Sequence, residues 1–196
     1  MAVSMGTGEG VETAGEPVKE TEAAVTNNKE DEAVTKEKPK ADSDEEKNKR
    51  KDTYVKDMKP HIDEAISEYD KIWNDLWIPT FTKLGSNEIT QIDAYKNIKD
   101  AQAKYDALFS QINKIEVPKG LTKEDKENIK EFKNGMTTSA MLRGDATKEA
   151  AKMIDTMDFS PSTMTEIEDI VSRSDAQMLS AIAHITSLEH GYGVER

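Results

Sequence analysis

One spacing recurs along this chain and constrains its fold more than any other feature. In the segment over residues 54–84, apolar residues alternate in steps of three and four, which keeps their side chains on one face of a long helix. This first stripe consists of Val55, Met58, Ile62, Ala65, Tyr69, Ile72 and Leu76. A helix with a single apolar stripe needs partners that cover it. No segment shows the period of two expected of a half-buried strand.

Three later segments carry stripes with the same spacing. The second stripe is Ala94, Ile98, Ala101, Tyr105, Leu108, Ile112 and Ile115. The third is Ile129, Phe132, Met136, Ser139, Arg143, Ala146, Ala150, Met153 and Met157, and the fourth is Ile167, Val171, Ser174, Met178, Ala181, Ile185 and Leu188. Short linkers make neighbouring helices antiparallel. The sequence therefore predicts an all-α fold, an up-down-up-down antiparallel four-helix bundle of helices about 45 Å long around a single dry interior.

Helix breakers lie inside two of these segments. Pro60 removes a backbone donor and clashes with the preceding turn. The unbroken register across Pro60 favours a kinked helix, with a helix start near Pro60 as the alternative. We expect the same helix to bend or break at Pro79 and to stop by Gly85. In the third segment, a polar stripe position at Arg143 and a glycine at Gly144 predict a break or a change of register.

Capping residues mark the expected starts of the later helices. Ser86 or Asn87 can cap the second helix, Thr122 the third, and Ser160 the fourth, with Pro161 at its first position.

Composition changes abruptly near residue 53. Residues 1–53 hold 14 acidic and 9 basic residues, and every Leu, Ile, Trp, Tyr and Phe lies after them. Such a segment buries too little apolar surface to offset its ordering entropy, so we expect residues 1–53 to be a disordered acidic linker and residues 54–196 to form the bundle. The net charge of −12 argues against nucleic-acid binding, which is mainly a cationic effect.

The stretch GTGEGVETAGEPVKETEAA, which begins at Gly6, resembles the mature start of a Gram-positive, bacillus-type surface lipoprotein. That resemblance implies a flexible tether that follows a lipid-modified cysteine. Contact with a membrane is then expected only through a lipid anchor that this sequence does not carry. The implied localisation is extracytoplasmic and membrane-anchored, with a cytoplasmic protein as the alternative. A Leu-x-x-Cys box directly before Gly6 would favour the first of these.

Residues that carry out chemistry are few. The chain has no cysteine, which excludes thiol nucleophiles and thiolate metal sites, and it has no run of about 18 apolar residues to cross a membrane. A di-iron bundle needs Glu-x-x-His pairs. None of the three histidines, His61, His184 and His190, follows a glutamate at that spacing. We therefore predict no catalytic residues, no metal site, no cofactor and no enzymatic activity.

Four aromatic residues recur every four positions on the first helix: Tyr69, Trp73, Trp77 and Phe81. Aromatic side chains are common in bundle cores, and they are also favoured at binding surfaces. If the chain has a binding site, we expect it where Pro79 bends the helix beside Trp77. A gap between helices there could hold a ligand or a partner segment.

These observations favour a non-enzymatic extracytoplasmic module, a helical bundle on a flexible tether that binds or supports other molecules. Its expected partner is a protein, a peptide or a cell-wall component. The alternative is a cytosolic helical-bundle regulator or assembly protein whose tail folds on a partner.

Overall fold

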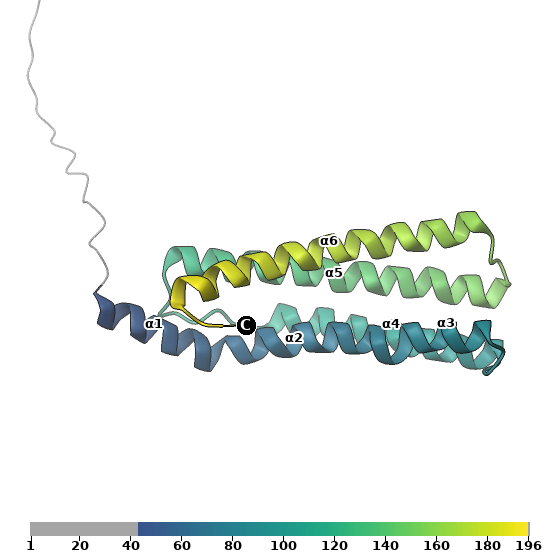
Figure 1. Ribbon diagram of the computed structural model, residues 1–196, viewed down its shortest axis with the longest axis horizontal. Coiled ribbons are helices and arrows are strands. Elements are labelled where there is room, and N and C mark those ends of the chain that lie inside the picture. Colours follow the sequence, from purple (N-terminus) through teal and green to yellow (C-terminus); the bar gives the residue numbers. More distant parts are fainter. Residues whose placement is uncertain (1–42, 196) are drawn as a thin grey trace, which may run out of the picture. The chain divides into compact units, whose positions relative to one another are not determined.

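The computed structural model describes residues 43–195, and all regular structure in that range is helical. In chain order the helices are α1 (Asp44–Asp57), α2 (Lys59–Ile72), the π-helix η1 (Trp73–Trp77), α3 (Ile78–Gly85), α4 (Gln91–Lys114), α5 (Lys123–Thr156) and α6 (Pro161–Tyr192). Figure 1 shows them lying side by side along their lengths. The all-α prediction is confirmed for residues 43–195, which contain no strand.

Helices α1, α2, η1 and α3 follow one another with only Met58 outside a helix, and we call residues 44–85 the first rod (Figure 1). Pro60 lies in the first turn of α2, where the missing N–H costs no helical hydrogen bond. The N–H of Met58 donates to the carbonyl of Tyr54 at 2.9 Å, and Tyr54, Met58 and Ile62 are all buried. The single kinked helix favoured from the register is therefore wrong, and the alternative holds, because α1 ends at Asp57 and a new helix begins at Lys59, beside Pro60. The predicted stripe is buried from Met58 to Ile72, whereas Val55 is exposed and Tyr54 takes its place in the core.

Helices α5 and α6 run antiparallel. Ser139 on α5 pairs with Ser174 on α6, with 3.0 Å between their hydroxyl oxygens. Nearer the start of α5, Asn128 lies 3.4 Å from the Nδ1 atom of His184, which is further along α6. Because the partner's number falls as the number on α5 rises, the two helices point in opposite directions.

Helices α4 and α5 are also antiparallel. Gln91 at the start of α4 donates to the carbonyl of Ile154 near the end of α5, and Lys133 of α5 donates to the carbonyl of Ile115 just after α4. The first rod is likewise antiparallel to α6, because Tyr54 bonds to Glu189 and Tyr69 bonds to Ser174.

Helix α5 runs from Lys123 to Thr156 without interruption, so the break predicted near Gly144 is absent. Thr122 caps α5 as predicted, and Ser160 caps α6 ahead of Pro161. The prediction that Ser86 or Asn87 caps α4 is wrong. Thr90 is the cap, and its side chain accepts a hydrogen bond from the N–H of Asp93. The cap lies later in the chain because α3 and the turn after it extend past Ser86.

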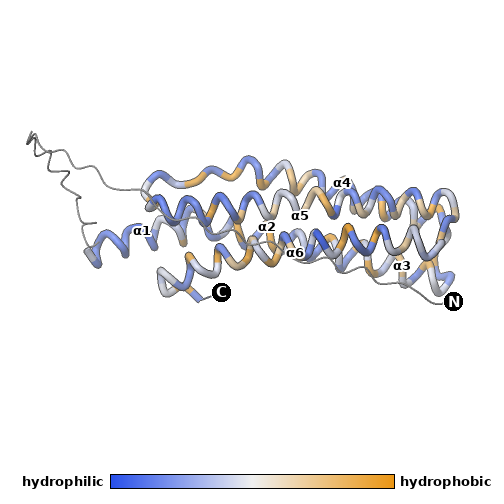
Figure 2. Tube along the Cα trace, turned by 90° about the horizontal axis from the view of Figure 1, so that it is seen from above, coloured by the Kyte–Doolittle hydropathy of each residue, from blue (hydrophilic) through white to orange (hydrophobic). Residues whose placement is uncertain are grey.

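Figure 2 shows hydrophobic positions recurring along the helices, and the buried ones form two clusters. The larger one includes Tyr54, Ile62, Leu108, Phe132 and Ile185, and the smaller one contains Ala94, Ile98, Ala150, Ile154 and Ile167. Both use residues from α4, α5 and α6. The single dry interior expected from the stripes is therefore wrong, because the buried residues form two clusters and the polar residues Ser139, Arg143 and Ser174 are buried in the same bundle.

The described helical structure begins earlier than the boundary predicted near residue 53. Ser43 caps α1, and Ser43 and Glu46 form a reciprocal capping box that satisfies two backbone donors. Residues 44–53 are thus helical, and the cap lies eleven positions ahead of Tyr54, the first aromatic residue. The rest of the predicted disordered tail, residues 1–42, lies outside the described residues.

Candidate functional site: an apolar pocket beside a π-helix

The π-helix η1 lies directly before Pro79. The N–H of Ile78 donates to the carbonyl of Trp73, five residues earlier, instead of four. A proline clashes with a regular preceding turn, and a wider π turn relieves that clash. Ahead of Pro79 the helix thus changes from α to π hydrogen bonding, and the rod ends at Gly85 as expected. Such turns occur frequently at functional sites.

Three of the four aromatic residues predicted as a binding set pack against one another along this turn and the start of α3; we call them the aromatic stack. The rings of Trp73 and Trp77 are stacked, with centroids 4.8 Å apart and planes 15° apart, and the Phe81 ring packs against Trp77 at 4.9 Å with its plane tilted by 58°. All three side chains are half-buried. The stack forms one wall of a cavity of about 460 Å³, which we call the tryptophan pocket.

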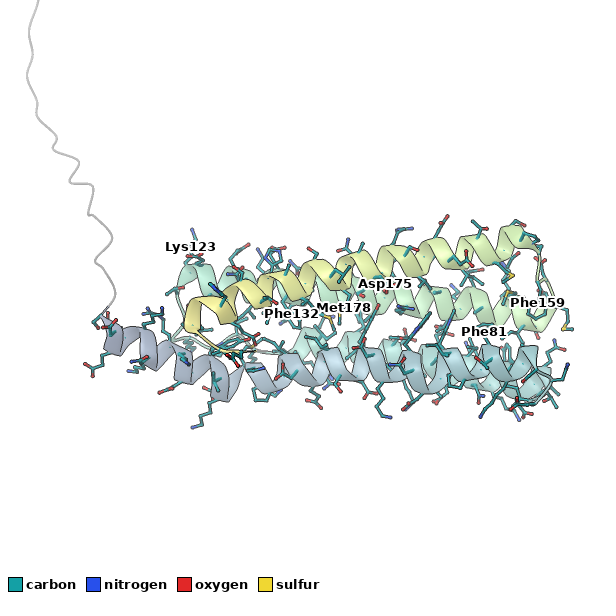
Figure 3. All side chains as sticks on the ribbon, in the orientation of Figure 1. Phe81, Lys123, Phe132, Phe159, Asp175 and Met178 are labelled. Atoms are coloured by element: carbon teal, nitrogen blue, oxygen red, sulfur yellow. The ribbon has the colours of Figure 1, made fainter. Side chains whose placement is uncertain are left out.

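Helices α5 and α6 and the turn between them form the opposite wall of the tryptophan pocket. It is lined by Met153, Phe159, Met164, Ile167 and Glu168. Figure 3 places Phe81 and Phe159 at the same end of the bundle. Phe159 and Met164 remain 41% and 47% exposed, although both are apolar. The pocket is therefore open to solvent and almost entirely apolar.

Tyr69, the fourth residue of the predicted set, does not line the pocket. It is 2% exposed, packs edge-on against Tyr105, and shares a 2.7 Å hydrogen bond with the hydroxyl of Ser174. Helix spacing puts Tyr69 on the same face as Trp73, but one turn earlier this face is covered by the other helices, so Tyr69 is buried where Trp73 is half-buried. Tyr69 is thus part of the core.

Arg143 of α5 reaches across the interior to the base of the aromatic stack. Its guanidinium carbon lies 3.6 Å from the ring centroid of Trp73, and its Nε donates to the Tyr69 hydroxyl at 2.9 Å. Nη2 donates to Asp175 at 2.5 Å. The side chain is only 6% exposed, and Nη1 has no hydrogen-bond partner within the part of the chain that the structure describes. A cation against the face of Trp73 fixes that ring, and with it the stack.

Two carboxylates surround the guanidinium of Arg143 without being equivalent. Asp175 is its ion-pair partner and is half exposed. Partial desolvation raises the pKa of Asp70 above its usual range, and the Asp175 charge adds to that, while Arg143 acts in the opposite direction. The cluster therefore pairs one buried cation with Asp175 and leaves Asp70 nearby without an ion pair to it.

From the sequence, the polar stripe position at Arg143 predicts a helix break, whereas the structure has an unbroken helix with Arg143 buried. The stripes contain a signal for this buried polar cluster. Ser139 and Arg143 in the third stripe, Ser174 in the fourth and the hydroxyl of Tyr69 in the first are polar groups that an antiparallel arrangement brings to one level. They bond to one another there, since Ser139 donates to the carbonyl of Ser174 at 2.9 Å and Ser174 to the carbonyl of Ser139 at 2.8 Å.

The chemistry available at the tryptophan pocket is binding. Its lining supplies thioethers, aromatic rings, one threonine hydroxyl and the Glu168 carboxylate. Across residues 43–195 no three His, Asp or Glu side chains are grouped so that they could hold a metal ion. A search of the same range finds no helix that is long and apolar enough to span a membrane.

Comparison with known proteins gives no relative: no protein-family model, curated protein or solved structure matches this chain.

Proposed function

We propose that this protein is a non-enzymatic binding module in which an up-down-up-down four-helix bundle holds an apolar ligand in the tryptophan pocket. The topology is supported by the antiparallel pairing of α4 with α5, of α5 with α6, and of the first rod with α6. The short turns before α4, α5 and α6 agree with it.

The observation that carries the proposal is the pocket itself. Its volume of about 460 Å³ lies within the range of small-molecule sites, and such sites are mostly apolar with few polar groups. Phe159, Met164 and Ile78 leave large apolar surfaces facing water at its rim. Contiguous apolar surface of this kind is typical of binding sites. Glu168 offers one polar contact that can orient a ligand.

The two tryptophans of the chain both line this pocket, so tryptophan emission reports on it alone. We would titrate the protein with the neutral apolar dye N-phenylnaphthylamine and follow tryptophan emission together with dye emission. The expected result is saturable energy transfer from tryptophan to one bound dye. Replacing Phe159→Ser together with Met164→Ser should weaken dye binding about tenfold or more, because two apolar contacts are lost.

A matched control is Met141→Ser together with Leu179→Ser. These residues are 48% and 68% exposed and lie outside the pocket, so their replacement removes comparable apolar surface elsewhere. The control variant should bind the dye as the unaltered protein does. Equal loss in both variants, or absence of energy transfer in the unaltered protein, would rule out the tryptophan pocket as the binding site.

We further propose that the module acts outside the cytoplasm on a membrane-anchored tether. The support is the acidic composition of residues 1–42 and the lipoprotein-like stretch that begins at Gly6. The native genomic sequence tests it. A Leu-x-x-Cys box immediately upstream of Gly6 is the expected result, and a plain start codon there would favour the cytosolic alternative.

A further inference from the structure

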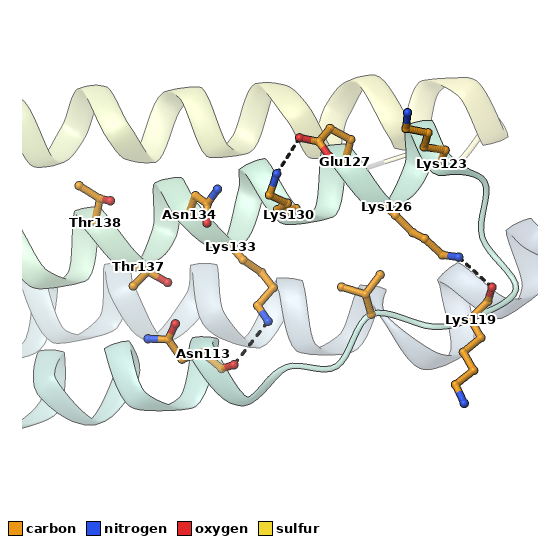
Figure 4. A pocket seen from close by; sticks show the side chains of 11 residues that line it. Asn113, Lys119, Lys123, Lys126, Glu127, Lys130, Lys133, Asn134, Thr137 and Thr138 are labelled. Atoms are coloured by element: carbon orange, nitrogen blue, oxygen red, sulfur yellow. Dashed lines mark hydrogen bonds and ion pairs between the residues drawn. The ribbon is translucent and has the colours of Figure 1, made fainter.

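Lysines gather in a second cavity, at the end of the bundle where α4 ends and α5 begins. This cavity, of about 920 Å³, lies between α4, the 115–122 connection and α5, and we call it the lysine groove (Figure 4). The lysines that line it are Lys119, Lys123, Lys126, Lys130 and Lys133. Figure 3 places Lys123 at the opposite end of the bundle from Phe159, so the groove is separate from the tryptophan pocket.

The charge of the groove contrasts with that of the chain. The whole protein carries −12, whereas Glu127 is the one acidic residue among the described residues that line the groove. The four groove lysines that belong to α5 are spaced 3, 4 and 3 residues apart, which puts them on one helical face. Like charges at this spacing destabilise a helix. A stripe of this kind therefore costs stability unless something compensates its charge.

Contacts within the groove position these lysines and neutralise little of their charge. Lys126 donates to the carbonyl of Lys119 at 3.0 Å, and Lys133 donates to the carbonyl of Asn113 at 3.4 Å (Figure 4). Lys133 also donates to the carbonyl of Ile115. Carbonyls hold an ammonium in place but carry no net charge. The Glu127 carboxylate pairs with Lys130 at 3.0 Å, and the Glu131 carboxylate lies 3.9 Å from the same ammonium. Both pairs are exposed to water, and among residues 43–195 no carboxylate forms an ion pair with the other four lysines of the groove. The groove therefore keeps a positive field.

The other end of the groove is polar and uncharged. Asn113, Asn134, Thr137 and Thr138 line it, and their amides and hydroxyls can bond to ligand hydroxyls. Among the described residues, none that lines the groove is aromatic. Proteins that bind single-stranded nucleic acid stack its bases on aromatic rings. The lining thus favours an anionic chain that carries hydroxyls over a nucleic acid.

We propose that the lysine groove binds a phosphate-linked polyol, an anionic chain in which phosphates alternate with hydroxyl-bearing units. The α5 lysines extend over about 15 Å of helix, which allows several successive phosphates to be contacted. The neutral amides and hydroxyls beside them receive the polyol units. This second site is independent of the tryptophan pocket, so either proposal can fail without the other.

The test uses the full chain and fluorescein-labelled short oligomers of glycerol phosphate, with binding followed by fluorescence anisotropy at several salt concentrations. The altered protein carries Lys123→Gln and Lys130→Gln, two exposed lysines at the groove. We expect at least a tenfold weaker affinity at low salt. The slope of log affinity against log salt should fall by about 1.4, the value for two lost contacts to a flexible chain.

The matched control carries Lys71→Gln and Lys152→Gln. Like Lys130, which is 61% exposed, these lysines are 63% and 73% exposed and each pairs with a nearby carboxylate on its own helix. The control loses the same net charge as the groove variant, but at two positions that do not line the groove. It should therefore bind the oligomer as the unaltered protein does. Equal loss in both variants would show a bulk charge effect and would overturn the proposal, as would unchanged binding in the groove variant.

Two further probes separate the ligand classes. A single-stranded oligonucleotide with the same number of phosphates and a poly-glutamate of the same charge should each bind at least tenfold more weakly than the glycerol phosphate oligomer. Tighter binding of the oligonucleotide would assign the groove to nucleic acid instead. Equal binding of poly-glutamate would reduce the groove to a site for any polyanion. Either result would overturn the proposal.

Discussion

At the scale of single residues, Arg143 is the side chain that departs furthest from the apolar pattern. Burying a guanidinium costs desolvation energy that its partners must offset. Trp73, Tyr69 and Asp175 provide that compensation, although Nη1 finds no acceptor among residues 43–195. The arginine thereby links the core to the tryptophan pocket, because the ring that it holds is the first of the aromatic stack.

The acid beside this arginine should make stability depend on pH. Burial raises the pKa of Asp70 above 3.8, so the folded state holds that proton more tightly than the unfolded state does. Its contribution to stability is fully present below the unfolded pKa and is lost as the pH rises through the folded pKa. Asp70→Asn should therefore stabilise the protein slightly at pH 7, and its advantage should shrink as the pH is lowered to about 4.

Urea unfolding at both pH values, followed by circular dichroism, measures this difference for Asp70→Asn. Asp52→Asn, at an exposed position on α1, controls for the loss of one negative charge. A variant at Asp70 that is less stable than the unaltered protein at pH 7 would contradict the argument, since attraction to Arg143 would then outweigh desolvation.

At the scale of elements, the contact between α5 and α6 depends on small side chains. A Cβ atom added at Gly135 would lie 2.9 Å from the Cβ of Ala181 and 3.0 Å from the backbone oxygen of Gln177. Backbone atoms cannot move aside cheaply, so the glycine sets how closely the two helices approach. Gly144 differs, because the nearest atom to its added Cβ is a carboxylate oxygen of the exposed Asp106 side chain, at 3.3 Å.

Alanine substitutions at the two glycines should therefore act in opposite directions. Alanine gains about 1 kcal/mol of helix propensity over glycine, but overpacking a tight contact costs about 1–3 kcal/mol. We expect Gly135→Ala to lower the free energy of unfolding by about 1 kcal/mol and Gly144→Ala to leave it unchanged or raise it. Urea unfolding of both variants measures this. Equal stabilisation by both would mean that the close approach at Gly135 is absent.

At the scale of the whole molecule, α1 belongs to the folded unit. Tyr54 is fully buried, its ring centroid lies 5.9 Å from that of Tyr192, and its hydroxyl donates to the buried Glu189 carboxylate at 2.8 Å. Lys51 adds a hydrogen bond to the carbonyl of Gly193 at 3.3 Å. These contacts tie the start of the first rod to the end of α6, and they lie on both sides of the boundary predicted near residue 53.

Two truncations should separate the chain into parts that do and do not stabilise the bundle. Removing residues 1–42 should leave the free energy of unfolding unchanged, because every residue of the described core lies after them. Removing residues 1–57 takes Tyr54 from the core and should cost about 3 kcal/mol or more. Urea unfolding, monitored by tryptophan emission, provides the comparison. A similar loss in both truncations would place stabilising contacts within residues 1–42.

The local sequence was sufficient to predict the helices, because helix period and capping depend on residues a few positions apart. The stripes, the Thr122 and Ser160 caps and the irregular helix near Pro79 all follow from such short-range patterns, and so does the location of Trp73, Trp77 and Phe81 beside it. Residues 44–53 were predicted to be disordered because they carry no large apolar residue, yet they form most of α1.

Other features depend on residues that only folding brings together. Arg143 is tolerated inside an unbroken helix because Tyr69 of α2, Trp73 of η1 and Asp175 of α6 meet it there. Tyr69 belongs to the core and Phe159 to the pocket for the same reason, since burial depends on neighbours across the bundle. The division of the interior and the gathering of lysines at one groove likewise arise from how the helices pack, which no stretch of a few residues encodes.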